Sequence, residues 1–331
     1  MAAAWGGGVL GWALAGRRRG ARRPPRSHEI SVGAGMPERR TEARAPLTPQ
    51  DALDAGVPEE AAARVADLSA LAEAAHAGAA GPPPLSDPLM LLRFLNAREG
   101  DVEAAARMYR ETVAWRAQFS IARVMASFGE GATYHADGEL QLGSSQWAWR
   151  PQTPEAQRLA RLAEFRRLPS LGPMGEPLLL WSVSDTDFAG IAQEGLEQVL
   201  LEAWVAHLED VLQAARAASL RHRRLVQARL VLDAGGLGLL DLKLLPMARN
   251  LIALGKSYFP EVTSSVTVVR APFLVERLFG AVRPCLTPVM DRKVAIFGDD
   301  FAEGLRRHAG VEMALLPTYL GGALGGGGRC G

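Results

Sequence analysis

Few residues in this 331-residue chain have the types and spacing that catalysis or metal binding requires. The sequence contains no G-x-S-x-G nucleophile turn, no Walker A loop and no H-E-x-x-H pair. The six histidines are scattered without the spacing of metal ligands, and His207 lies among apolar residues that repeat at helical spacing. That position favours a buried core histidine over a catalytic one. We therefore predict no catalytic residue, no metal site and no enzymatic activity.

One glycine-rich turn deserves comparison with a nucleotide-binding loop. Gly235, Gly236 and Gly238 follow an apolar run that is typical of a buried strand. A dinucleotide-binding turn needs a third Gly or Ala three residues after its second glycine, and Asp241 stands there instead. A nucleotide-dependent enzyme that uses Gly236 and Gly238 is therefore kept only as a minor alternative.

Composition excludes several other classes of protein. With 48% hydrophobic residues the chain is too apolar to be disordered, and its two cysteines exclude a disulfide scaffold or a Cys-rich metal site. The net charge of +1 argues against a nucleic-acid partner. The charge is unevenly placed, because eight of the 37 basic residues lie within 1–40 and leave 29 basic against 34 acidic residues in the rest.

The first 45 residues are predicted to be disordered or to form a targeting segment. Residues 3–16 are weakly apolar and too short to span a bilayer, and an arginine block follows them. An Arg-rich, acid-poor leader suits an organellar transit peptide, which would place the protein in an organelle. The alternatives are an unstructured tail or an upstream extension with initiation at Met36.

The remaining boundaries follow from prolines, glycines and helical patterns. We expect a helix and a Pro-rich linker over 46–84, a small helical bundle over 85–128, and a disordered Gly-rich tail over 325–331. Asp87 is a suitable N-cap for the first helix of the bundle, with Pro88 at its first helical position.

The second half of the chain has the pattern of an α/β domain, which we place at 150–324. Four short, nearly continuous apolar runs predict strands buried on both faces, and amphipathic helices are expected between them over 194–217 and 240–255. This order predicts a mainly parallel sheet covered by helices. The predicted strands are 177–183, 228–234, 266–269 and 293–297.

The segment 271–288 contains a further amphipathic helix. Leu274, Leu278, Phe279 and Val282 line one side of it. It is either an ordinary helix packed on the sheet or a movable lid whose apolar face closes a cavity or contacts a bilayer.

The motifs, taken in order, resemble those of the CRAL-TRIO lipid-transfer family. The family includes phosphatidylinositol/phosphatidylcholine transfer proteins, cellular retinaldehyde-binding protein and the α-tocopherol transfer protein. The matching segments cover about residues 85–324. They are LLRFLNAREGDVEAAARMYRETVAWR (91–116), GEPLLLW (175–181), LVLDAGGLGL (230–239), YFPE (258–261), VTVVRAPFLVERLFGAVRPCL (266–286), KVAIFGDDF (293–301) and LPTYLGGAL (316–324).

This resemblance implies a small helical bundle followed by an α/β domain with a deep apolar pocket, gated by the helix near 273–283. It implies non-enzymatic binding and transfer of a hydrophobic lipid by a monomer that works in the cytoplasm and binds membrane surfaces transiently. No cofactor is expected apart from the bound lipid, and no protein partner is specified. The residues we expect to line the pocket are Trp181, Leu230, Leu232, Phe273, Leu274, Leu278 and Phe279.

The resemblance leaves the ligand open. Family members that bind phosphatidylinositol share a polar set around the headgroup, for which the corresponding residues here are Arg98, Asn250 and Arg283. Glu99 follows Arg98 where those members have a lysine, and its charge would repel a phosphate. A phospholipid, an isoprenoid and a tocopherol-like ligand are therefore all retained. The other alternative is a protein-interaction module of the same fold with a vestigial pocket.

Overall fold

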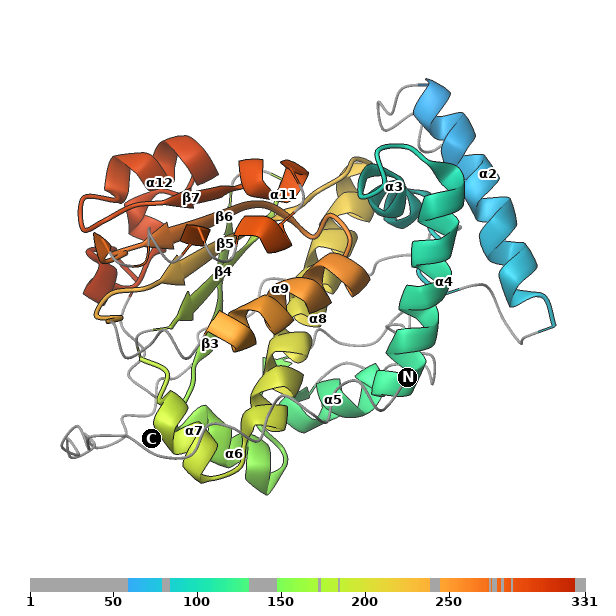
Figure 1. The fold of residues 1–331 in the computed structure, drawn as a ribbon. Coiled ribbons are helices and arrows are strands. Elements are labelled where there is room, and N and C mark those ends of the chain that lie inside the picture. Colours follow the sequence, from blue (N-terminus) through green and yellow to red (C-terminus); the bar gives the residue numbers. More distant parts are fainter. Residues whose placement is uncertain are drawn as a thin grey trace, which may run out of the picture.

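The computed structural model describes residues 59–78, 84–130, 148–171, 174–183, 185–238, 245–273, 275, 279–280, 283–286 and 288–324. The domain predictions for 1–45 and 325–331 fall outside these ranges. Within them the chain forms a mixed α/β structure in which helices precede a central sheet (Figure 1).

Four helices come first in the described chain, as the sequence predicts. Their local signals agree with their geometry, because the Asp87 carboxylate accepts a hydrogen bond from the Met90 amide at 3.0 Å and Pro88 occupies the first turn. Asp101 caps the next helix in the same way, through the Ala104 amide at 2.9 Å. The helices are α2 (Glu59–His76), α3 (Pro88–Asn96), α4 (Val102–Phe119) and α5 (Ile121–Phe128).

The main sheet has five strands in the order β3-β4-β5-β6-β7. β4 to β7 are parallel, and β3 pairs antiparallel with β4 at one edge. The strands are β3 (Phe165–Leu171), β4 (Glu176–Ser182), β5 (Ala228–Asp233), β6 (Thr263–Val269) and β7 (Val294–Ile296). A two-stranded ribbon joins β1 (Gly129–Glu130) and β2 (Ala148–Trp149).

The predicted strands are confirmed, and β3 is an addition. β3 escapes prediction because its sequence, FRRLPSL, mixes charged residues with a proline. An antiparallel strand at the edge of a sheet tolerates both, since one side of it is not hydrogen-bonded.

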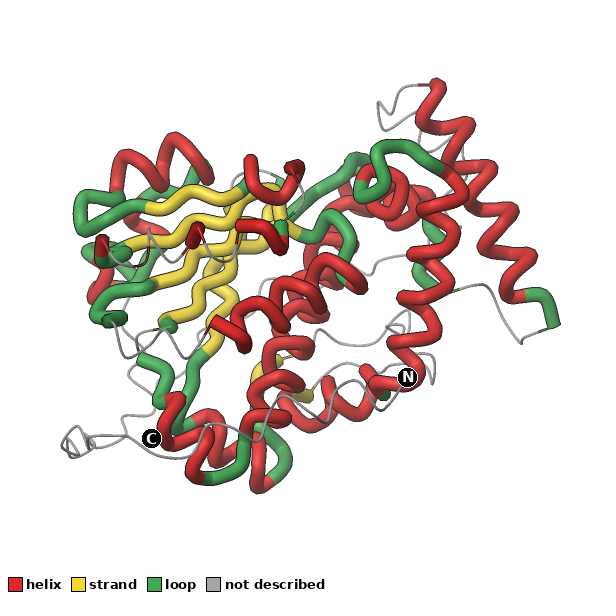
Figure 2. Tube along the Cα trace, viewed as in Figure 1, coloured by secondary structure: helices red, strands yellow, loops and turns green. Residues whose placement is uncertain are grey.

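Helices cover both faces of the sheet (Figures 1 and 2). The long helix α8 crosses one face and α9 lies on the same side, whereas α12 lies on the other. The later helices are α6 (Pro154–Ala160), α7 (Phe188–Gln193), α8 (Glu197–His222), α9 (Leu245–Tyr258), α11 (Pro288–Arg292) and α12 (Ala302–Ala309), with short 3-10 turns at Arg283–Cys285, Met313–Leu315 and Thr318–Leu320.

The helical segment and the α/β segment share one hydrophobic core. Buried residues of α2 to α5 belong to the same cluster as those of α8, β4 and β5. Arg116 of α4 forms a bidentate ion pair with Glu209 of α8, at 2.7 and 2.8 Å, and both side chains are fully buried. The two segments therefore pack as one body. A second cluster lies between the sheet and α12.

Candidate ligand-binding cavity

A cavity of about 430 Å³ lies between the sheet and the helices on the α8 side. This volume falls in the range of small-molecule sites, roughly 300 to 1,000 Å³. β4 to β7 form its floor. Its other walls come from the end of α3, α8, α9 and the segment 275–290. We refer to it as the main cavity.

The floor of the main cavity consists of two rows of apolar side chains that run across the strands. Strand register aligns Trp181, Leu232, Val268 and Ile296 in one row, and aligns Leu230, Val266 and Val294 in the other. All seven residues line the cavity. Because alternate residues of a strand point to opposite faces, Leu178, Leu180 and Val231 pack in the second cluster instead.

Two helices supply the apolar wall above this floor. From α8, Trp204 and Leu208 lie four residues apart and so share a face of the helix. From α9, the contributing residues repeat at three- and four-residue intervals, which is the spacing of one helical face. They are Met247, Ala248, Leu251, Ile252, Gly255 and Lys256.

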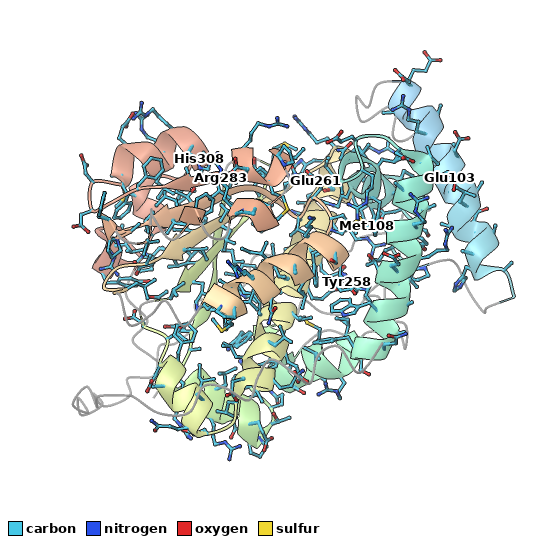
Figure 3. All side chains as sticks on the ribbon, viewed as in Figure 1. Glu103, Met108, Tyr258, Glu261, Arg283 and His308 are labelled. Atoms are coloured by element: carbon cyan, nitrogen blue, oxygen red, sulfur yellow. The ribbon has the colours of Figure 1, made fainter. Side chains whose placement is uncertain are left out.

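Charged residues gather at one end of the main cavity, where the loops that precede β6 and β7 meet the end of α3. Arg98, Glu99, Lys256, Glu261 and Lys293 all contribute to the wall there. Figure 3 shows Glu261 at the end of the sheet next to α3. The main cavity is therefore apolar along its floor and charged at one end, as a site for an amphipathic ligand requires.

Glu261 is the most connected of these charged residues. Its carboxylate accepts hydrogen bonds from Lys293 Nζ at 2.7 Å and from Gln227 Nε2 at 2.8 Å. Its backbone has a φ of 50°, in the left-handed region, and its carbonyl accepts a hydrogen bond from Arg93 at 2.7 Å. The α3 helix thus fixes the backbone at the charged end of the cavity.

Arg93 itself is an unusual core residue, with 1% of its surface exposed. Burial lowers the pKa of its guanidinium from 12.5 to about 10, and the group stays charged at neutral pH. It also donates to the Val226 carbonyl at 2.5 Å and the Ser219 hydroxyl at 3.2 Å. One side chain of α3 therefore forms hydrogen bonds with the end of α8 and with the loops that precede β5 and β6.

The residues predicted to line a pocket have different positions in the structure. Trp181, Leu230, Leu232 and Phe279 lie in the wall of the main cavity, whereas Leu274 and Leu278 fall outside the described residues. Phe273 differs from the prediction, because 70% of its surface is exposed and it is not part of the wall. It directly follows Pro272, where the helical segment begins, and its side chain faces outward.

The three predicted headgroup residues are not brought together. Arg98 is in the wall and donates to the Ala97 carbonyl at 3.1 Å. Asn250 is exposed on α9, because it follows the cavity-lining residues Met247 and Ala248 onto the outer side of the helix. Arg283 is exposed and pairs with Asp291 at 2.6 Å (Figure 3). The prediction is corrected for these last two residues.

Sequence reasoning missed Lys256, Glu261 and Lys293 as members of the cavity wall. Glu261 and Lys293 stand in the segments YFPE and KVAIFGDDF, so the signal was a charged residue one or two positions before each strand. Lys256 lies four residues after Ile252 on α9, and the helical repeat of cavity-lining residues predicts it.

The glycine turn after β5 packs against a charged side chain of the protein. The guanidinium of Arg270 lies against Gly235, where a Cβ would approach it to 2.7 Å, and Arg270 pairs with the buried Asp233. This arrangement counts against the nucleotide-dependent alternative.

Neither a metal site nor a membrane-spanning helix is found among the described residues. No group of three or more His, Cys, Asp or Glu side chains in this part of the chain is arranged to hold a metal ion. Among the same residues, no helix combines the length and apolar character needed to cross a bilayer.

The mostly parallel sheet forms the floor of an apolar cavity, and the helices that precede it share its hydrophobic core. This arrangement is that of an α/β binding protein. Residues 168–322 match the family model described as the CRAL/TRIO domain. Residues 168–322 therefore resemble a CRAL-TRIO domain, in agreement with the sequence motifs, and the CRAL-TRIO family is known for lipid binding and transfer.

The similarity to curated relatives covers more of the chain than residues 168–322. A CRAL-TRIO domain-containing protein of Saccharomyces cerevisiae is 23% identical over 243 residues, which cover 71% of each chain. The SEC14 cytosolic factor of Kluyveromyces lactis is 26% identical over 239 residues, again 71% of each chain. The phosphatidylinositol/phosphatidylcholine transfer protein SFH4 of Arabidopsis thaliana is 22% identical over 249 residues, 73% of this chain and 36% of the relative.

A solved structure supports the fold. The crystal structure of Sfh5 superposes with a TM-score of 0.51 over 76% of this chain and 83% of the other, at 10% sequence identity. This similarity concerns the arrangement of helices and strands and confirms the Sec14-like fold.

Proposed function

We propose that the protein binds one lipid molecule in the main cavity and carries it between membranes without covalent chemistry. The observation that supports this most directly is the floor of the cavity, two rows of apolar side chains over four strands, with charged groups at one end. Such a cavity accepts a hydrocarbon chain along the floor and a polar group beside Arg98, Glu261 and Lys293.

The energetics of lipid transfer call for such a carrier. Each methylene of a lipid costs about 0.8 kcal/mol to expose to water, so a diacyl lipid with roughly 30 methylenes costs on the order of 20 kcal/mol to release. A carrier avoids this cost only if its own apolar wall replaces the contacts that the lipid makes in the bilayer. It must also stay closed in water, because an open cavity would expose the same apolar area.

The segment that contains Val275 and Phe279 is the part of the wall best suited to open. Both residues line the main cavity, and Leu286, Val289 and Met290 continue the wall beyond them. This wall belongs to the connection between β6 and β7, residues 270–293, rather than to the core helices α8 and α9. We propose that it moves as a gate when the protein meets a membrane.

The ligand class that fits best is a lipid with one compact polar end. The charged end of the cavity contains both acidic and basic side chains. In the Glu261–Lys293 pair, the Glu261 carboxylate would accept a hydrogen bond from the headgroup, and the Lys293 ammonium would donate one to it. The printed name of SFH4 assigns it phosphatidylinositol and phosphatidylcholine, and we propose that this chain binds a related phospholipid. The name SEC14 cytosolic factor supports a cytoplasmic location. We infer peripheral binding to membranes from the proposed transfer of lipid between them.

The test is to purify the protein, extract it with organic solvent and identify the lipid by mass spectrometry. Ile252→Asp places a carboxylate in the cavity wall, and Ala253→Asp places the same group on the exposed side of α9. We expect lipid in the wild type and in Ala253→Asp, and little in Ile252→Asp, with parallel losses of vesicle-to-vesicle transfer. Absence of lipid and of transfer in the wild type would contradict the proposal and favour an interaction module.

A further inference from the structure

Glu261 has an unusual backbone conformation at the charged end of the main cavity (Figure 3). Its φ of 50° lies in the left-handed region, which a residue with a long side chain adopts only where its surroundings hold it. Two donors hold its carbonyl, the Arg93 guanidinium at 2.7 Å and Gln227 Nε2 at 3.1 Å. The backbone at this point is therefore fixed by two separate side chains.

The Gln227 amide also holds the side chain of Glu261. Its Nε2 donates to the Glu261 Oε2 atom at 2.8 Å as well as to the Glu261 carbonyl. The nitrogen of an amide group has two hydrogens, so it can donate to both acceptors at once. Because both bonds come from one nitrogen, they fix the carboxylate relative to the backbone of the same residue.

These bonds leave one oxygen of the carboxylate for a ligand. Lys293 Nζ donates to the same Oε2 atom at 2.7 Å, so Gln227 and Lys293 share that oxygen. Among the described residues, no group donates a hydrogen bond to Glu261 Oε1. The Glu261 side chain is 14% exposed and lines the main cavity. Oε1 is therefore the acceptor that Glu261 offers to a molecule in the cavity.

Gln227 is itself held in place by the core. The Val226 carbonyl before it accepts a hydrogen bond from Arg93 at 2.5 Å, and the Ala228 amide after it donates to a carbonyl just before β6 at 2.8 Å. These bonds fix the backbone on both sides of Gln227. Gln227 is not among the described residues that line the main cavity, so it can influence a ligand only through Glu261.

The need to satisfy buried polar groups does not explain Gln227. The Glu261 carbonyl already has a charged donor in Arg93, and Oε2 already has one in Lys293. Hydrogen bonds from charged donors are stronger than those from a neutral amide. The contribution that is specific to Gln227 is therefore the orientation of the carboxylate.

We propose that Gln227 is a positioning residue, which holds the Glu261 carboxylate so that Oε1 accepts a hydrogen bond from a hydroxyl group of the ligand. This inference rests on the proposed function, because the ligand is the lipid of the main cavity. An ionised carboxylate only accepts hydrogen bonds, so it favours a polar end that has an O–H donor over one that has none. Holding the oxygen in place before the ligand arrives lowers the cost of ordering it during binding.

The experiment compares two lipids of equal charge and equal acyl chains, each in competition with a fluorescent phosphatidylcholine for the full chain. Phosphatidylglycerol has hydroxyl groups on its headgroup, and phosphatidylpropanol has none. The test variants are Gln227→Leu and the isosteric Gln227→Glu, which both remove the donor. The matched control, Gln198→Leu, removes an exposed amide that donates to a different glutamate, Glu202, at 3.4 Å. Gln227→Lys restores a donor, and its charge acts equally on the two lipids.

We expect the wild type to bind phosphatidylglycerol about tenfold more tightly than phosphatidylpropanol, as a hydrogen bond to a charged group would give. Both test variants should lose most of this preference, because their affinity for phosphatidylglycerol falls while that for phosphatidylpropanol stays the same. Gln198→Leu and Gln227→Lys should keep the preference. In a Glu261→Ala background, Gln227→Leu should not change the preference further, because it acts through the carboxylate that is already absent.

An unchanged preference in the test variants, or an equal loss of affinity for both lipids, would overturn the positioning role, because a residue that only supports the fold gives the second result. A wild type that contains lipid but binds the two probes equally well, or binds neither, refutes the role of Oε1 and leaves the carrier intact. A wild type that contains no lipid and transfers none refutes the proposed function, and this inference with it.

Discussion

Replacing Ala248 by leucine tests whether the main cavity holds the hydrocarbon chain of the ligand. Ala248 lies in the middle of α9 and lines the cavity, so a larger side chain there occupies space that the ligand would use. Leucine adds three carbon atoms. Since each buried methylene contributes about 0.8 kcal/mol, displacing three carbons of a ligand chain weakens binding by about 2.4 kcal/mol, or roughly 60-fold.

The same calculation predicts a compensating change in the ligand. A lipid whose chain is about three carbons shorter regains the lost space and should bind Ala248→Leu nearly as well as the longer lipid binds the wild type. Ala253→Leu is the matched control, because Ala253 lies on the exposed side of the same helix and the substitution is chemically identical. Helix propensity cancels in this comparison.

The assay is mass spectrometry of the lipid extracted from each purified variant, followed by competition between lipids of different chain length. We expect the chain-length distribution of Ala248→Leu to shift toward shorter lipids, and that of Ala253→Leu to match the wild type. An unchanged distribution in Ala248→Leu, with unchanged affinity for the longer lipid, would refute the placement of the hydrocarbon chain beside α9.

Three further predictions concern stability, measured by chemical unfolding over a range of pH. Burial raises the pKa of Asp210 from 3.8 to about 6, so this carboxyl disfavours the folded state increasingly as the pH rises from 3.8 to 6. Asp210→Asn should therefore gain about 3 kcal/mol over the wild type between pH 3.8 and pH 7, and a constant difference would contradict this. Burial lowers the pKa of His207 from 6.5 to about 3, so the wild type loses stability as the pH falls below 6.5. His207→Leu should remove about 3 kcal/mol of that loss at pH 4.5, and parallel pH curves would show that His207 is not the cause. Arg116→Met should cost about 3 to 5 kcal/mol, because it leaves the buried Glu209 carboxylate without its cation. The double variant Arg116→Met/Glu209→Met should recover most of that loss, and a double variant as unstable as the single one would refute the reasoning.

Regular patterns made most of the fold predictable. The apolar runs at 177–183 and 228–234 correspond to β4 and β5 because strands buried on both faces admit few polar residues. Asp87 and Pro88 marked the start of α3 through local chemistry that does not depend on the rest of the chain. Such signals involve only residues that are close in the sequence, so they do not depend on how distant segments pack in the folded chain.

The site was less predictable because it depends on register and on contacts between distant segments. Leu232 could be assigned to a buried strand, but its alignment with Trp181 and Val268 in one row follows only from strand pairing. Asn250 was placed by motif alignment, and the rotation of α9 turns it away from the cavity. The backbone of Glu261 is held in place by a hydrogen bond from Arg93, a residue 168 positions earlier in the chain.

Arg93 also limits how this protein can be divided. The segment that matches the CRAL/TRIO family model begins at residue 168, yet the carbonyls of Val226 and Glu261 within that segment receive their hydrogen bonds from α3. A fragment that starts at 168 would remove the charged donor from those carbonyls, leaving them the Ser219 hydroxyl and the Gln227 amide, and would expose the face of α8 that α3 and α5 cover. We expect it to aggregate rather than to act as a smaller carrier. Truncation studies of this protein should therefore keep the helices from Glu59 onward.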